Sequence, residues 1–483
     1  MLFTEPAFLF LFLPLVLILH NLPGIRVKNL MLLVVSLVFY ALGERVYLLV
    51  MIASIVFNYL TGLIIQRAWD RNAANTAKTA LIVGLLGNLG MLFGYKYTNF
   101  MADSINSILP ASIMSIQLDP IHLPIGISFF TFQGLSYVFD VYRRTHPAQQ
   151  SLTDLGLYIS LFPQLIAGPI VRYQDVADAI GQRSVTVDKF AEGIRRFSFG
   201  FAKKMLIANS VALQADVIFA LPAEELTAGA AWVGAILYAI QIYFDFSGYS
   251  DMAIGLGLML GFRFVENFNY PYAAISVTDF WRRWHISLST WFRDYLYIPL
   301  GGNRQGAFRT YLNSVIVFLL CGLWHGASWT FVLWGLYHGA FLVIERLGIT
   351  KRLRLNLPVL SNVYTMIAVL IGWVLFRANT VEQAGLFLGK MFTTAPSIIL
   401  STAVEQLPTR VVWPMIIGLL FAWPVAPALR RWLDRLQESS RTGGQVLAFA
   451  TNSCELVLVV GLLVLGTLSS VAGTYNPFIY FRF

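Results

Sequence analysis

The sequence predicts an all-α fold, a polytopic integral membrane helical bundle. Only 12% of the 483 residues are charged and 57% are hydrophobic, with a mean hydropathy of +0.67. Soluble globular chains carry about 25% charged residues. This chain has too few polar residues to cover the surface of a protein of its size in water. Most of its surface must therefore face lipid. The apolar runs are continuous rather than alternating, which favours helices over a β-barrel.

The net charge of +9 allows two interpretations. Basic chains can bind nucleic acid, but membrane proteins also concentrate Lys and Arg in cytoplasmic loops. We favour the second interpretation and expect the lipid bilayer, and no nucleic acid, as a partner.

The predicted spans are stretches of roughly 17–25 apolar residues, some of them shorter and tilted. We interpret the N-terminal run as a retained first span, because it has no basic segment and no small-residue cleavage site of a signal peptide. We expect 11 or more membrane helices in a single membrane domain over 1–483. The predicted spans are 7–24, 30–43, 47–65, 80–95, 121–139, 155–171, 205–221, 228–244, 252–262, 313–343, 359–376, 411–429 and 456–472.

Loop charges predict the orientation, because Lys and Arg collect on the cytoplasmic side. The loops 25–29, 66–79 and 140–150 are basic and alternate with less basic loops. This places the N-terminus outside. The loops 346–358 and 430–445 are also basic, which places the C-terminal tail outside after the last span.

The stretch 313–343 has no charge and is long for one span. Both of its flanks are basic, so both should lie on the same side, and this requires a hairpin. Its natural turn is GLWHGA, residues 322–327. About 12 residues at 1.5 Å each reach roughly the middle of the bilayer, so His325 is expected deep in the membrane on a turn.

A first polar block lies in the apolar region 240–262. Asp245 and Asp251 flank a small-residue segment that includes Ser247. Polar groups inside a membrane are costly and are often functional. The favoured interpretation is a polar clasp between helices, since small residues allow close packing; a direct catalytic role is the alternative.

A second block reads FWRRWHISLSTWFRDYLYIPLGGNR. Aromatic and apolar residues recur at helical spacing and the polar residues lie largely opposite, which predicts an amphipathic helix at the membrane interface. The residues on the apolar face are Phe280, Trp284, Leu288, Trp291 and Tyr295. On spacing alone, His285 in this block is more often structural than catalytic.

A third block, CGLWHGASWTFVLWGLYHG, contains His325 and His338. Thirteen residues separate them, so they would not share a helical face, and an H-x-x-x-H metal site is excluded. A neutral histidine can accept a proton from a hydroxyl, which suits a general base for acyl transfer. A buried packing histidine is the alternative. Nucleophile-elbow, P-loop and zinc-protease motifs are absent from the sequence.

The chain ends in NPFIYFRF, residues 476–483. Tails are usually polar and frayed, whereas this one is aromatic. It could anchor at the interface or fold back into a cavity. Tyr480 carries its only hydroxyl group.

Together these blocks resemble the conserved segments of a known protein family. The runs YFDFSGYSDMAIG (243–255), WRRWHISLSTWFRDYLYIPLGGNR (281–304) and LWHGASW (323–329) resemble the membrane-bound O-acyltransferase superfamily. They are most similar to its bacterial polysaccharide branch, whose type member is the alginate O-acetylase membrane subunit. LPIGISFFTFQGLSYVFDVYR (123–143) and FPQLIAGPIVR (162–172) support this, and the resemblance covers nearly the whole chain.

The resemblance implies a membrane O-acetyltransferase with a central waist, in which His325 matches the family's catalytic histidine. His285 matches a second family histidine and is the second catalytic candidate, which would support or orient the reacting groups. It implies acetyl-CoA as a cytosolic donor, with no bound cofactor, and release of the acetyl group on the outer side of the bacterial inner membrane. Arg282 and Arg283 are donor-phosphate candidates. The tail is similar to an F-x-Y-F-x-F motif, which makes Tyr480 a candidate acyl relay.

Partners of the SGNH/AlgX-like periplasmic acetyltransferase type, within an exopolysaccharide acetylation machinery, are also implied. Alginate is the default polymer, and cellulose, peptidoglycan or another envelope polymer would use similar chemistry. A transporter without acyl chemistry is the alternative class. The lack of paired broken-helix repeats in the sequence disfavours it.

Overall fold

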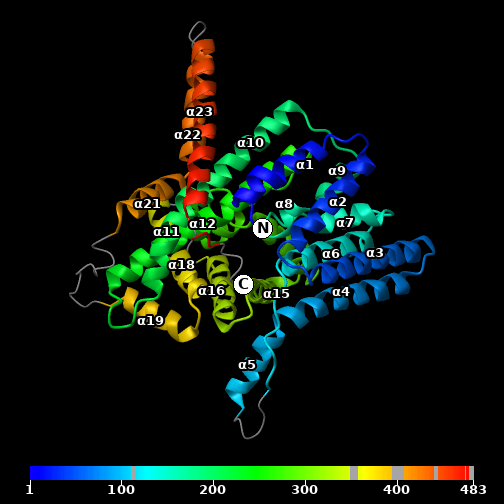
Figure 1. Cartoon of the computed structure of the whole chain (residues 1–483). Coiled ribbons are helices and arrows are strands. Elements are labelled where there is room, and N and C mark those ends of the chain that lie inside the picture. The colour runs from blue at the N-terminus through cyan, green and yellow to red at the C-terminus, as the bar shows by residue number, and fades with distance from the viewer. Residues whose placement is uncertain (110–115, 349–356, 394–406, 440–443, 474, 478–483) are drawn as a thin grey trace.

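The computed structural model describes residues 1–109, 116–348, 357–393, 407–439, 444–473 and 475–477. Within these ranges the chain forms helices and connecting segments without a strand, which confirms the expected all-α class (Figure 1). The elements of the first half, with η for short π-helical or 3-10 turns, are η1 (Phe8–Phe12), α1 (Leu13–Leu19), α2 (Ile25–Ala41), α3 (Leu48–Asp70), α4 (Ala74–Lys96), α5 (Thr98–Ile108), α6 (Ile127–Tyr142), α7 (Leu152–Ser160), α8 (Phe162–Leu165), α9 (Tyr173–Gly181), α10 (Val187–Ala202), η2 (Lys203–Ala208) and α11 (Asn209–Phe219).

The second half begins with the longest helix and contains the three polar blocks of the sequence. Its described elements are α12 (Ala228–Met259), η3 (Pro271–Ala273), α13 (Val277–Arg283), α14 (Ile286–Phe292), η4 (Arg293–Tyr297), α15 (Gly306–His325), α16 (Trp329–Arg346), α18 (Pro358–Arg377), α19 (Val381–Met391), α21 (Thr409–Phe421), α22 (Val425–Ser439) and α23 (Gly444–Ala472).

Among the described residues, six helices are long and apolar enough to cross a membrane: α3, α4, α12, α15, α18 and α23. The count rises to seven if α21 and α22, which meet at a 61° bend, form one span. The expected 11 or more membrane helices are therefore not confirmed. Several predicted spans are short or broken: the N-terminal run, for example, is helical only over 8–19.

The buried helix α12 lies at the centre of the molecule and packs against α10, α11, α18 and α19. Two separate spans were predicted at 228–244 and 252–262, but the structure has one continuous helix of 32 residues. At 1.5 Å per residue it is about 48 Å long. The polar block between the predicted spans is helical, and its small residues, such as Gly248 and Gly255, pack closely against α10.

The prediction of a single span over 155–171 is also wrong, because these residues do not form one helix. It contains α7, the single turn α8 and a segment without regular structure. Its polar groups are satisfied inside the protein: Gln164 donates from its side chain to the Tyr158 carbonyl oxygen at 2.6 Å, and the Ile170 amide donates to Ser287 Oγ at 2.9 Å. Non-helical backbone at membrane depth is tolerated where protein surrounds it.

Two parts project from the body in Figure 1: the pair α22 and α23 on one side and α5 on another. Large apolar side chains on α23, including Leu456, Val457 and Leu468, are exposed in the chain alone. This is the pattern expected of a helix that faces lipid.

Candidate active site

His325 is the last residue of α15, at the turn of a helical hairpin. Gly326 ends α15, and α16 begins at Trp329 and packs along it. The chain thus turns in the GLWHGA segment where the sequence predicts it. However, α15 begins at Gly306, seven residues before the apolar stretch, so its 20 residues are about 30 Å long. The membrane depth of His325 stays a prediction.

His285 lies in a break between α13 and α14. Its backbone is left-handed, with φ 44° and ψ 55°, a conformation that costs energy in a non-glycine residue. The single amphipathic helix expected here is therefore wrong. The predicted aromatic face is buried in the protein core rather than exposed at the membrane surface: Phe280, Trp284 and Trp291 are at most 6% exposed. These rings pack against aromatic neighbours, as Trp291 does on Phe132 with centroids 3.7 Å apart.

The fold brings the two histidines together. The ring centroids of His285 and His325 are 6.3 Å apart, and both side chains are buried. Aromatic rings surround them: Trp334 lies 5.1 Å from His325, and Phe246 lies 4.7 Å from His285. Burial lowers the pKa of His285 to about 3, because desolvation disfavours the charged ring.

A cavity of about 370 Å³ reaches His325. Its lining also includes Lys96, Ile166, Trp324 and the segment 122–129. The side chain of His122 is 59% exposed and lies 3.2 Å from the Glu44 carboxylate, whereas His325 is 4% exposed. The cavity therefore connects the buried histidine with the molecular surface. Its volume is within the range of small-molecule sites, about 300–1,000 Å³.

Lys96, the last residue of α4, is buried beside this cavity. The sequence did not predict it as a site residue. Its ammonium group donates to the carbonyl oxygens of Trp324 and His325 and, at 3.3 Å, to Ser128 Oγ. A cation suits the carbonyls at the C-terminal end of a helix. Lys96 thus holds the end of α15 where His325 emerges. In the sequence it follows an apolar span directly and resembles an ordinary loop lysine.

The two donor-phosphate candidates end α13 next to His285. Arg282 is exposed, and Arg283 pairs with Asp279 one turn earlier at 3.0 Å. The structure therefore leaves Arg282 at the surface and ties Arg283 to its own helix.

The acidic residues of the first polar block pair with cations on a neighbouring helical segment. Lys204 lies 2.6 Å from Asp245, and Lys203 lies 2.7 Å from Asp251, which also pairs with Arg196 at 2.8 Å. These are contacts between α12 and the α10–η2 segment.

Small residues allow the same two segments to approach closely. A Cβ atom added at Gly248 would lie 2.7 Å from the Gly200 carbonyl oxygen. Ser247, the neighbour of Gly248 in the chain, is buried.

The chain end approaches the same contact. Pro477 accepts a hydrogen bond from Lys204 through its carbonyl oxygen, Asn476 accepts one from Asn209 at 3.0 Å, and Tyr475 donates to Asp216. Tyr480, the acyl-relay candidate, lies outside the described residues. The described part of the tail therefore packs on η2 and α11.

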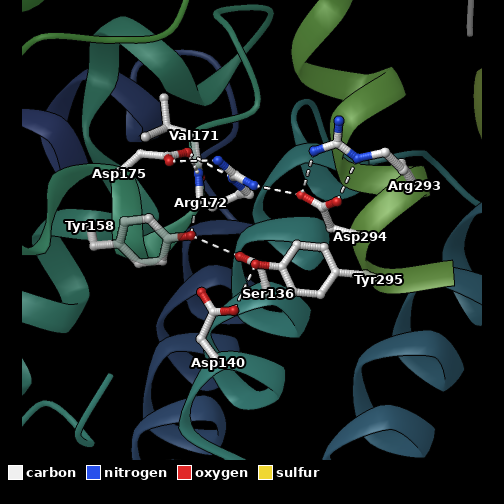
Figure 2. Close-up of polar contacts among 9 residues, drawn as sticks. All are labelled: Ser136, Asp140, Tyr158, Val171, Arg172, Asp175, Arg293, Asp294 and Tyr295. Carbon is white, nitrogen blue, oxygen red and sulfur yellow. Dashed lines mark hydrogen bonds and ion pairs between the residues drawn. The ribbon is translucent and has the colours of Figure 1, made fainter. Parts of the chain in front are cut away.

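A polar network holds the far end of the second block (Figure 2). Arg172 pairs with Asp175 and Asp294, both at 2.8 Å, and Tyr295 donates to the Asp140 carboxylate at 2.8 Å. Nearby, Tyr158 and Ser136 share a hydrogen bond of 3.0 Å. The network fixes η4, and with it the segment that begins at His285, against α6 and α9.

Comparison with known proteins shows the family of this chain. The chain is 51% identical over 395 residues to the probable alginate O-acetylase AlgI of Pseudomonas aeruginosa, covering 81% of this chain and 75% of the relative. The profile of the membrane-bound O-acyltransferase family matches residues 143–381. The chain belongs to the membrane-bound O-acyltransferase family.

Two further relatives, one of which is named for a different polymer, are similar to this chain over most or all of its length. The probable alginate O-acetylase AlgI of Azotobacter vinelandii is 43% identical over 503 residues and covers both chains completely. The peptidoglycan O-acetyltransferase of Helicobacter pylori is 36% identical over 419 residues, with 80% of this chain and 78% of the relative covered. This membrane-bound O-acyltransferase is therefore an enzyme and a multi-pass membrane protein, and the transporter alternative is set aside.

Proposed function

We propose that this protein acetylates an exported polysaccharide, taking the acetyl group from a donor in the cytosol and passing it across the bacterial inner membrane. One observation carries the proposal. His325 lines a cavity that opens to the surface, and the ring of His285, from a different part of the chain, lies beside His325 with the centroids 6.3 Å apart. Such a buried pair, in a family of acyltransferases, suits proton transfer during attack on an acyl donor.

In the proposed reaction His325 is the general base. The acceptor hydroxyl attacks the carbonyl carbon of the acetyl thioester, and its proton moves to the imidazole of His325. The new ester C–O bond forms as the C–S bond breaks, and the proton returns to the leaving thiolate. Lys96 holds the backbone of His325 during these steps. His285, next to it, orients the reacting groups.

Acetyl-CoA is the proposed donor. Arg282 and Arg283 are its proposed phosphate contacts, since guanidinium groups bind phosphates well. Arg282 is free to turn towards such a ligand at the surface, whereas Arg283 would have to exchange its pair with Asp279.

Loop charges support an orientation with the N-terminus and the C-terminal tail in the periplasm. The exposed end of the cavity, near Glu44 and His122, then lies on the periplasmic side. We propose that the acetyl group leaves there to SGNH/AlgX-like acetyltransferase partners. The described residues 475–477 bring the tail to η2, and Tyr480 beyond them is the proposed carrier of the acetyl group.

The base assignment is tested by His325→Ala, with the acetyl content of the exported polymer as the readout. His338→Gln is a matched control, because His338 is also buried and its ring accepts a hydrogen bond from the Trp281 indole at 3.3 Å. We expect acetylation to be lost in His325→Ala and retained in His338→Gln. Normal acetylation by a well-expressed His325→Ala protein would contradict the proposal.

The polymer is tested by complementation. Alginate is proposed first, because two relatives with high identity bear that name. The chain is expressed in an alginate producer that lacks its own O-acetylase, and ester acetyl on alginate and on peptidoglycan is measured by NMR. Restored acetyl on alginate supports the assignment, and acetyl found on peptidoglycan alone would replace it. Tyr480→Phe in the same strain tests the relay: unchanged acetylation would leave the tail as an anchor only.

A further inference from the structure

The segment that follows α12 runs beside the break that contains His285. Two backbone hydrogen bonds tie them: the Ile286 amide donates to the Asn267 carbonyl at 3.0 Å, and the Asn269 amide donates to the Arg283 carbonyl at 2.9 Å. Asn267 is 1% exposed, and its side chain points to the imidazole of His285, with Oδ1 3.1 Å from Nδ1. The proposed reaction does not by itself assign any role to Asn267.

The orientation of the Asn267 amide follows from its neighbours. The Ser287 backbone N–H, which can only donate, points to Oδ1 at 3.3 Å. Ser287 Oγ accepts from the Ile170 amide at 2.9 Å and donates to the same Oδ1 at 2.9 Å. On the other side, Asn267 Nδ2 donates to Ser250 Oγ at 2.9 Å. The oxygen of the amide therefore faces His285.

This orientation decides the tautomer of His285. Because Oδ1 can only accept, the ring nitrogen that faces it must donate, so Nδ1 carries the proton. Burial keeps the ring neutral, and Nε2 then carries the lone pair. The titratable side chain of His325 lies next to this ring, with the centroids 6.3 Å apart. The left-handed backbone of His285 persists because these bonds and the Ile286 bond hold it from both sides.

We propose that Asn267 is a positioning residue that fixes His285 as the Nδ1–H tautomer, which makes Nε2 the nitrogen that accepts a hydrogen bond during the reaction. This rests on the proposed function for its substrate, the acceptor hydroxyl. In this state His285 accepts a hydrogen bond from that hydroxyl and aims it, while His325 removes the proton. A neutral His285 of this tautomer has no Nε2 proton to donate to the acyl carbonyl oxygen.

The tautomer is read directly by ¹⁵N NMR of the full-length protein, labelled at histidine and reconstituted in lipid. The His285 signals are assigned by their loss in His285→Gln. We expect a protonated Nδ1 and an unprotonated Nε2 in the unmodified protein, and a change of this pattern in Asn267→Leu. A protonated Nε2 in the unmodified protein would overturn the proposal, whether or not the protein transfers acetyl.

Kinetics give the second readout. Partners that orient a histidine contribute about 10–100-fold to activity in metal sites, and we expect Asn267→Leu to lower kcat by a similar factor with KM nearly unchanged. Asn267→Asp keeps an acceptor oxygen facing Nδ1 and should restore most of kcat. Asn313→Leu is the matched control, because Asn313 is equally buried but bonds only to carbonyls in 300–302 among the described residues.

Each result points to one conclusion. Equal losses of kcat in Asn267→Leu and Asn313→Leu, or no rescue by Asn267→Asp, would show a structural role and overturn the positioning role. If His325→Ala retains acetylation, the proposed function fails, while the NMR spectrum still decides the tautomer.

Discussion

The ring centroids of His285 and His325 lie 6.3 Å apart, although one residue interrupts α13 and α14 and the other ends α15. Each histidine occupies a break in helical structure, where its side chain is directed by tertiary contacts rather than by a continuous helix. Because the two rings are this close, we propose that the pair acts as a single functional unit.

Residues that act as a unit lose activity non-additively. We therefore expect the double variant His285→Ala/His325→Ala to have the same residual acetyl transfer as His325→Ala alone. The measurement is initial-rate transfer to a polysaccharide acceptor, with protein amounts matched by immunoblot. A double variant slower than His325→Ala by the full factor of His285→Ala would indicate independent roles.

Lys96→Met should lower the transfer rate by about 10–100-fold. The change removes the donor to the carbonyls that end α15, and a catalytic group displaced by about 1 Å can lose about 100-fold in rate. Lys78→Met is the control, because Lys78 lies on the same helix α4 and is exposed. Equal transfer rates in Lys96→Met and Lys78→Met would contradict a role of Lys96 in positioning His325.

Lys204→Met should lower stability by about 3–5 kcal/mol, the usual cost of removing one partner of a buried ion pair. Both side chains of the Lys204–Asp245 pair are 2% exposed. The double variant Lys204→Met/Asp245→Leu should recover part of this loss, because it also removes the buried carboxylate. Thermal unfolding in detergent is the measurement, and a double variant less stable than Lys204→Met would contradict this account.

Gly248→Ala should destabilise the contact between α10 and α12 by about 1–3 kcal/mol through overpacking. The added methyl group would meet backbone, which cannot move aside as a side chain can. Gly94→Ala is the control, because a Cβ atom at this helical position meets nothing within 4 Å. That variant should be neutral or more stable by up to about 1 kcal/mol. Equal unfolding temperatures for both variants would speak against close packing at Gly248.

Tyr295→Phe should destabilise the protein by about 1–3 kcal/mol, since it removes the donor to the buried Asp140 carboxylate. Tyr297→Phe, two residues further on, removes the hydroxyl that accepts an exposed hydrogen bond from Arg346 at 3.2 Å. Its effect should stay within about 0.5 kcal/mol. The comparison of the two unfolding curves decides whether the network of Figure 2 stabilises η4.

Much of the fold was predictable because it depends on composition and local pattern. The scarcity of charge requires lipid as the solvent, and the GLWHGA segment between two apolar runs predicts the hairpin that ends at His325. The pattern could not determine how many helices cross the membrane. An apolar run such as 155–171 looks the same whether it faces lipid or lies broken inside protein, because burial and lipid contact favour the same residues.

The site depended more on tertiary structure. The sequence predicted a catalytic role for both histidines through their resemblance to the family and their chemistry, but it did not show that the two rings meet. It also missed Lys96 and Asn267, which resemble ordinary loop residues in the linear order. Their proposed roles rest on contacts with distant residues, namely the α15 carbonyls for Lys96 and His285 for Asn267. Hydrogen bonds and ion pairs form only at short range, so helix packing alone decides which polar groups become partners.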